Sequence, residues 1–293
     1  MGKTGDNRSL GTAEGALMGR AAHSLHAESP ILDDPWAVRL LAPETRKLVH
    51  DPNFGTGGMK WDGFDTAPLF ALNIGALRYA EDEVERSCRA GIAQYVILGA
   101  GFDTFALRRS DLCDRLRVYE VDHPDVQALK RRRIDDAEEL PASMPIFVPV
   151  DFERTSLRAA LAASGFESTE RSVFSWMNTL PYLSADAIEE TLHEIAALSA
   201  PGSRLVLNYA CDVAMSREQR DYLETLESLV LRHGEPMRSG WKPEAFERLL
   251  DDAGFSRVEH ISESELAQRY FAGRRDGLVP TTPARLVIAE RRG

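Results

Sequence analysis

Cysteine is scarce in this chain. Cys88, Cys113 and Cys211 are the only three among 293 residues, and they lie far apart. Such spacing excludes a disulfide framework and a C-x-x-C metal knuckle. No cluster of His, Cys, Asp or Glu has metal-ligand spacing either, so no metal is expected. Scarce, scattered cysteines are typical of a reducing, intracellular setting.

Long apolar runs and an excess of positive charge are also absent. No run approaches the roughly 20 apolar residues of a membrane span, and the first residues, MGKTGDNRSLGTAEG, lack the apolar core of a signal peptide. With 35 Lys and Arg against 46 Asp and Glu, the net charge is -11, which disfavours nucleic acid as a partner. We expect a soluble cytoplasmic protein with no membrane partner.

From about residue 90, short apolar runs alternate with amphipathic stretches. This alternation predicts an α/β fold with a doubly wound parallel sheet and helices on both faces. No long helix separates the last two predicted strands, so the seventh strand is expected to pair antiparallel to its neighbours, as in a methyltransferase-type sheet. The predicted strands are 93–98, 117–122, 145–151, one within 171–182, 203–209, 256–261 and 283–292.

Residues 1–88 have a different pattern. Helical periodicity in 12–27 and 33–42 is followed by a Gly-rich loop over 50–64 and a further helical stretch. We predict a helical lid over residues 1–88 that shapes an acceptor pocket, on a ligand-binding domain over 89–293.

The stretch VILGAGFDTFALRR, residues 96–109, predicts a nucleotide pocket. Gly99 and Gly101 let the backbone pass close beneath a ligand. A dinucleotide fingerprint needs a third glycine, and Thr104 occupies that position. The neighbouring Asp103 would repel a pyrophosphate at a helix N-terminus but suits the cationic end of S-adenosylmethionine (SAM). A tight strand-to-helix turn would also need glycine for steric reasons alone.

Two acidic residues end the next two predicted strands. Asp122 lies 23 residues after Gly99, where a carboxylate can accept the ribose hydroxyls; it could instead cap the helix that begins at Pro124. Asp151 could accept the adenine amine with Phe152 packed on the ring, or cap the helix after Thr155. Together with the turn, these features predict SAM as the cofactor.

The chain resembles the leucine carboxyl methyltransferase family, and within it the bacterial SAM-dependent O-methyltransferases of the tetracenomycin polyketide type. The resemblance runs in order from about Ser9 to the C-terminus through YVILGAGFDTFALRR, VYEVDHP, FVPVDFER, FSWMNTLPYLS, APGSRLVLNY and RYFAGRRDGL. It implies a class I SAM-dependent methyltransferase, with a Rossmann-like sheet of seven strands, an antiparallel last strand and an N-terminal helical lid.

Carried over by position, the resemblance implies a set of cofactor-binding residues. Arg78 would grip the cofactor carboxylate, Asp122 in the VDHP motif would hold the ribose, and Trp176 would pack along the cofactor or belong to the core. The full set is Arg78, Gly99, Ala100, Gly101, Asp103, Asp122, His123, Asp151, Phe152 and Trp176.

Three positions depart from the family pattern. Ala76 replaces the first arginine of an R-x-R pair, and Met177 replaces a glutamate that lies near the cofactor. Upstream of an Asp-Pro, Arg20 or His23 stands in the place of a lysine.

Methyl transfer needs alignment and exclusion of water rather than a metal. A carboxylate acceptor is already ionised at neutral pH, whereas a hydroxyl needs a general base. The bases on offer are Tyr182, His23 and His26; the two histidines share one helix face and could equally be surface residues. We expect O-methylation of a small metabolite, with a polyketide-like carboxylate as first candidate. The alternatives are a non-catalytic SAM-binding protein and an NAD(P)-dependent oxidoreductase. The sequence does not reveal the oligomeric state.

Overall fold

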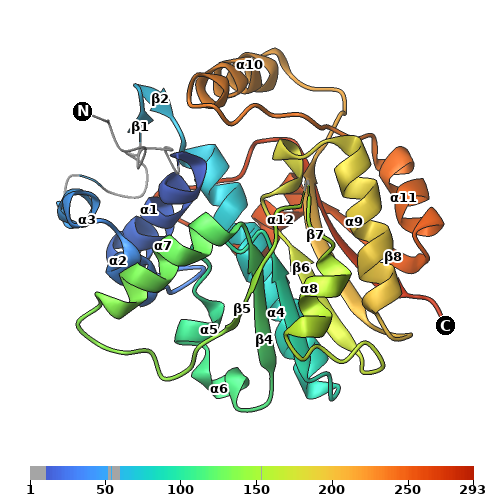
Figure 1. Ribbon diagram of the computed structural model, residues 1–293. Helices are drawn as coiled ribbons and strands as arrows, with labels where there is room; N and C mark the ends of the chain where they lie inside the picture. The colour runs from blue at the N-terminus through green and yellow to red at the C-terminus, as the bar shows by residue number, and fades with distance from the viewer. Residues whose placement is uncertain (1–10, 52–53, 55–59, 153) are drawn as a thin grey trace, which may run out of the picture.

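Seven strands form one sheet in the computed structural model, which describes residues 11–51, 54, 60–152 and 154–293 (Figure 1). Their order across the sheet is β5-β4-β3-β6-β7-β9-β8. The strands are β3 (Gln94–Leu98), β4 (Arg117–Asp122), β5 (Ile146–Pro149), β6 (Ser172–Trp176), β7 (Arg204–Ala210), β8 (Phe255–Ser262) and β9 (Ala284–Arg291).

The predicted antiparallel last strand is confirmed. Strands β3 to β7 pair in parallel, and β9 inserts between β7 and β8, antiparallel to both. Every side chain of β3 and of β6 is buried. Near-continuous apolar runs of this kind are typical of parallel strands covered on both faces. The parallel strands covered by helices that the alternation predicted are present, with the antiparallel last strand that the resemblance also implied.

Helices cover both faces of the sheet (Figure 1). On one face lie α4 (Ala67–Arg89) and α12 (Glu263–Tyr270), which share a core with β3, β7 and β9. On the other lie α8 (Leu157–Ala163), α9 (Ala185–Leu198) and α11 (Pro243–Asp252), with a second core. The shorter helices α5 (Phe105–Arg108) and α6 (Ser110–Cys113) follow β3, and α7 (Pro124–Asp135) follows β4.

The helix caps follow from single side chains. The hydroxyl of Ser184 accepts a hydrogen bond from Ala187 N–H at the start of α9. Ser216 forms a reciprocal capping box with Gln219 at the start of α10 (Arg217–Arg232).

A helical layer lies over the carboxyl edge of the parallel strands. It contains α1 (Gly11–His26), α2 (Pro35–Leu40), α3 (Pro43–Val49) and the short hairpin β1 (Lys60–Trp61) and β2 (Phe64–Asp65). The one-turn 3-10 helix η1 (Leu180–Tyr182) follows β6. Although α4 falls within the predicted lid, it packs against β6 and β7. The boundary at residue 88 remains a prediction, but α4 belongs to the sheet's own covering layer.

The contact of α1 with α4 generates a stability prediction. A Cβ on Gly19 would lie 2.2 Å from the Phe70 ring, whereas a Cβ on Gly15, one turn earlier in α1, meets nothing within 4 Å. We expect Gly19→Ala to lower the free energy of unfolding by about 1–3 kcal/mol, because the ring must move. Gly15→Ala, the matched control, should raise it by up to about 1 kcal/mol through helix propensity. Urea unfolding measures both, and equal effects would contradict the packing argument.

Candidate functional site

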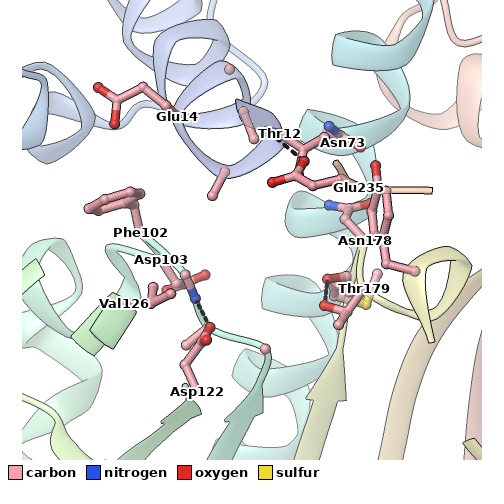
Figure 2. A pocket seen from close by; sticks show the side chains of 18 of the residues that line it. Thr12, Glu14, Asn73, Phe102, Asp103, Asp122, Val126, Asn178, Thr179 and Glu235 are labelled. Atoms are coloured by element: carbon pink, nitrogen blue, oxygen red, sulfur yellow. Dashed lines mark hydrogen bonds between the residues drawn. The ribbon is translucent and has the colours of Figure 1, made fainter. Parts of the chain in front are cut away.

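A cavity of about 1950 Å³ lies where the parallel strands end. Its floor is formed by the residues that follow β3, β4, β5 and β6, and its roof by α1, α4 and the loop after α10. Figure 2 shows Asp122 and Phe102 at one end, and Asn73, Asn178 and Glu235 at the other. The topology therefore gathers into one space the loops that sequence reasoning had predicted to meet.

The glycine turn after β3 requires its glycines. Gly99 and Gly101 have φ angles of 61° and 50°, in the left-handed region. A Cβ on Gly99 would lie 2.5 Å from Thr179 Oγ1, so a side chain there would collide with the loop after β6. Gly99, Ala100 and Gly101 all line the cavity. Glycine is therefore required at 99 by the packing of Thr179, and the close approach of this backbone to a ligand stays a prediction.

Asp122 is held by the turn that it faces. Its Oδ2 accepts a hydrogen bond from Gly101 N–H, and its Oδ1 accepts one from His123 N–H at 2.6 Å. Burial raises the pKa of Asp122, and these two N–H groups oppose the rise. The helix α7 is capped by His123, whose ring accepts from Asp125 N–H. Asp122 is therefore not the cap of that helix, and each oxygen keeps lone pairs for a ligand in the cavity.

Asp103 also lines the cavity. One of its oxygens accepts from Phe105 N–H at 2.7 Å. Burial raises the pKa of this carboxyl, while the positive charges of Lys130 and Arg20 lower it. Beneath the turn, Lys130 is fully buried and pairs with Glu120. The negative residues of the turn are thus backed by buried positive charge, which the sequence pattern did not reveal.

Asp151 and Phe152 line the cavity beside Asp122. The cap of α8 is Ser156, so Asp151 does not carry out that alternative role. The Phe152 ring lies 6.2 Å from the Trp176 ring, and the two are stacked at 26°. Trp176 itself is fully buried in the core and does not line the cavity, so the alternative that assigned it to the core is the one the structure favours.

Arg78 does not reach the cavity. It lies on an exposed face of α4, paired with Asp82 at 2.8 Å. The α4 residues that line the cavity include Asn73, Leu77 and Glu81. Arg78 points away from the cavity because consecutive residues of a helix differ by about 100° around its axis. The cavity lies on the side of α4 that carries Leu77. The prediction that Arg78 grips the cofactor is not supported by this position.

The two lid histidines also lie outside the cavity lining. His23 is buried, and its Nε2 accepts a hydrogen bond from Ile31 N–H at 2.8 Å. Burial, followed by the charge of Arg274, lowers the pKa of His23 to about 4. His26 Nε2 lies 2.6 Å from Val49 O. Both rings hold the lid together, so neither is retained as a candidate base.

Tyr182 lines the opposite end of the cavity from Asp122. Burial and the charge of Glu235 raise the pKa of Tyr182 to about 12. At neutral pH its hydroxyl is protonated, which suits a hydrogen-bond donor better than a base.

Several lining residues were missed by sequence reasoning. Asn178 has a φ of 59° and exchanges hydrogen bonds with Asn208, from Asn178 N–H to Oδ1 at 2.6 Å and from Asn208 Nδ2 to Asn178 Oδ1 at 3.0 Å. A left-handed non-glycine residue at a cavity is a frequent mark of function. The polar Asn208 within the apolar strand β7 was a sequence feature that could have marked this part of the site. No comparable sequence feature marked Asn73 or Glu235.

Neither a membrane-spanning helix nor a metal cluster is found in the described part of the chain. None of its helices is long and apolar enough to cross a bilayer. No group of three or more His, Cys, Asp or Glu side chains there could hold a metal ion.

The profile of the leucine carboxyl methyltransferase family matches residues 13–196, well over half of the chain. The chain belongs to the leucine carboxyl methyltransferase family. SAM is accordingly its cofactor, as the names of its relatives state for them. The family match covers the lid and the strands β3 to β6, which contain most of the cavity lining.

Two relatives in sequence agree with this membership. YktD of Bacillus subtilis (strain 168), assigned by its name to the SAM-dependent methyltransferases, is 32% identical over 201 residues, or 68% of this chain and 66% of that protein. A Mycobacterium avium (strain 104) protein with the same assignment is 29% identical over 289 residues, 92% of this chain and 85% of its own length. Among solved structures, magnesium protoporphyrin IX methyltransferase of Synechocystis PCC 6803 has a TM-score of 0.48 at 14% identity, covering 84% of this chain and 92% of that one.

Asp122 gives a direct test of the cofactor site. We expect Asp122→Asn to weaken SAM and S-adenosylhomocysteine (SAH) binding by about 10- to 100-fold, because a charge-assisted hydrogen bond is lost. The control is Asp135→Asn, an exposed carboxylate on α7. Titration calorimetry measures both, and undiminished binding by Asp122→Asn would contradict the assignment.

His23 generates a pH prediction. Its folded pKa of about 4 lies below the unfolded value of about 6.5, so the unfolded chain takes up a proton first as the pH falls. Stability is therefore complete above about pH 6.5 and is lost progressively toward pH 4, by about 2 kcal/mol at about pH 5. We expect His23→Gln to remove this part of the acid loss in urea unfolding. His193→Gln, at an exposed site on α9, should keep it; identical pH curves for the wild type and His23→Gln would refute the argument.

Proposed function

We propose that this protein transfers the methyl group of SAM to an oxygen atom, a carboxylate or a phenolic hydroxyl, of a small metabolite. A polyketide or similar secondary metabolite is the first candidate. The observation that carries the proposal is a single cavity that joins the turn at Asp122 to a separate polar end near Asn178. Its 1950 Å³ exceeds the roughly 300–1,000 Å³ of an ordinary ligand pocket, so cofactor and acceptor have room side by side.

The residues at the strand ends fit the cofactor. The backbone of Gly99 and Gly101, which line the cavity, would lie beneath its methionine part. Asp122 would accept the ribose hydroxyls with the lone pairs that its two N–H donors leave. Asp151 and Phe152 would hold the adenine. Asp103 would face the cationic groups and take part of the duty of the glutamate that Met177 replaces.

For methyl transfer the protein mainly has to position the acceptor against the methyl group. SAM supplies an activated methyl group, so the transfer is an in-line displacement in which the acceptor oxygen must be aligned and water excluded. Asn178, fixed by Asn208, and Tyr182, a protonated donor, would orient the acceptor. The raised pKa of Tyr182 supports orientation rather than proton abstraction.

A non-catalytic SAM-binding protein is the second candidate. It is favoured by Met177 and Ala76, which replace two polar family residues near the cofactor. An NAD(P)-dependent oxidoreductase has no comparable support, because the family is one of methyltransferases and Asp103 occupies the turn where a pyrophosphate would bind.

Calorimetry and a product assay test the proposal together. We expect the wild type to bind SAM and SAH, and to release SAH when SAM is supplied with a panel of aromatic hydroxy and carboxy compounds. The no-acceptor reaction is the baseline. SAM binding without SAH release across the panel would favour the non-catalytic candidate. No SAM binding at all would overturn both.

A further inference from the structure

Glu235 lies in the loop after α10, far in sequence from every residue that the family resemblance assigns to the cofactor. It is half-buried and lines the cavity. Its Oε2 accepts a hydrogen bond from Thr12 N–H, in the first turn of α1, at 3.0 Å. Figure 2 shows the side chain at the same end as Asn73 and Asn178, across the cavity from Asp122.

The second oxygen of this carboxylate is available to a ligand. Among the described residues, Glu235 Oε1 has no hydrogen-bond partner, and no cation lies within ion-pair distance of the carboxylate. In Figure 2 this oxygen points toward the open middle of the cavity. Glu14, another lining carboxylate, differs because Arg133 neutralises it at 2.7 Å. Glu235 therefore presents an uncompensated negative charge to whatever occupies its end of the cavity.

The neighbouring groups reinforce this polarity. The charge of Glu235 contributes to the raised pKa of Tyr182, which keeps that phenol neutral. Asn73, Asn178 and Asn208 are uncharged, and His233 Nε2, two residues before Glu235, lies 3.3 Å from Asp62 Oδ2. A second carboxylate placed here would be repelled at short range in a partly desolvated site, whereas a hydroxyl or an ammonium would form a charge-assisted hydrogen bond.

We propose that Glu235 determines acceptor specificity by binding a hydrogen-bond donor of the acceptor, a hydroxyl or a protonated amine, and that the methyl group goes to a hydroxyl of a neutral or cationic molecule rather than to a carboxylate. This inference rests on the proposed function. The acceptor oxygen forms its bond to the methyl carbon as the carbon–sulfur bond breaks with its electron pair on sulfur. The hydroxyl proton passes to the Glu235 carboxylate, the general base within reach of the acceptor, and from there to solvent.

Four probes share one ring system and differ in the charge of the group that would face Glu235. They are 2-naphthol, 6-(aminomethyl)-2-naphthol, 6-hydroxy-2-naphthoic acid and 2-naphthoic acid, which present neutral, cationic and anionic groups. Their dissociation constants are measured by NMR titration against the SAH complex, and SAH release is measured with SAM. We expect the wild type to bind the amine and 2-naphthol more tightly than either acid, and to methylate hydroxyls only.

Three variants separate specificity from structure. Glu235→Gln keeps an oxygen that can accept from Thr12 N–H but removes the charge, so the melting temperature should stay unchanged while the amine-to-acid binding ratio falls by about 10- to 100-fold. Glu227→Gln, at an exposed site on α10, makes the same change in net charge and should keep the wild-type ratio. Glu235→Ala, which also removes the bond to Thr12, reports any purely structural role through its melting temperature.

The outcomes are distinct. An unchanged ratio in Glu235→Gln, tighter binding of the acids by the wild type, or binding of none of the four probes to the SAH complex would overturn the inference. Failure of the wild type to bind SAM would overturn the proposed function instead. SAM binding with turnover and an unchanged ratio would overturn the role of Glu235 alone.

Discussion

The buried carboxylate of Asp34 joins the helices α1 and α2 to the glycine turn after β3. It is fully buried and accepts hydrogen bonds from Arg20 Nε at 2.9 Å, Thr104 Oγ1 at 2.7 Å and Ala37 N–H at 2.9 Å. Arg20 in turn donates to Phe102 O, within the turn itself. A buried ion pair is costly unless its hydrogen bonds are satisfied, and here they are. The arrangement holds α1 and α2 in one position over the turn.

The shape of the cavity follows from that attachment. Because α1 is fixed at Arg20, its first turn extends over the other end of the cavity, where Glu235 meets Thr12 N–H. The helix α1 is thus held at Thr12 and at Arg20, by residues from opposite halves of the chain. The space between the two attachments holds the proposed cofactor site at Asp122 and the proposed acceptor site near Asn178.

Much of the fold and part of the site could be predicted from the sequence. The strand pattern and the antiparallel last strand depend on local patterning, and both were confirmed. Asp122 was predicted at the end of its strand as a ligand or a helix cap, and the structure shows its carboxylate accepting from Gly101 N–H. Arg78 and His23 lie outside the cavity lining, which the sequence could not show because motif position gives neither the phase of a helix nor the direction in which a buried ring points.

The sequence by itself determined the family, the order of strands along the chain and the residues at their carboxyl ends. These features depend on short motifs and on the hydrophobic periodicity of neighbouring residues. Only the tertiary structure decided which side chains face the cavity. Glu235 and Thr12 are 223 residues apart. Asn178 lies in the loop after β6, whereas Asn208 lies in β7. No local sequence pattern could relate the members of either pair. Their meeting depends on how α1 is held above the sheet, and contacts of that range arise only when the whole chain has packed.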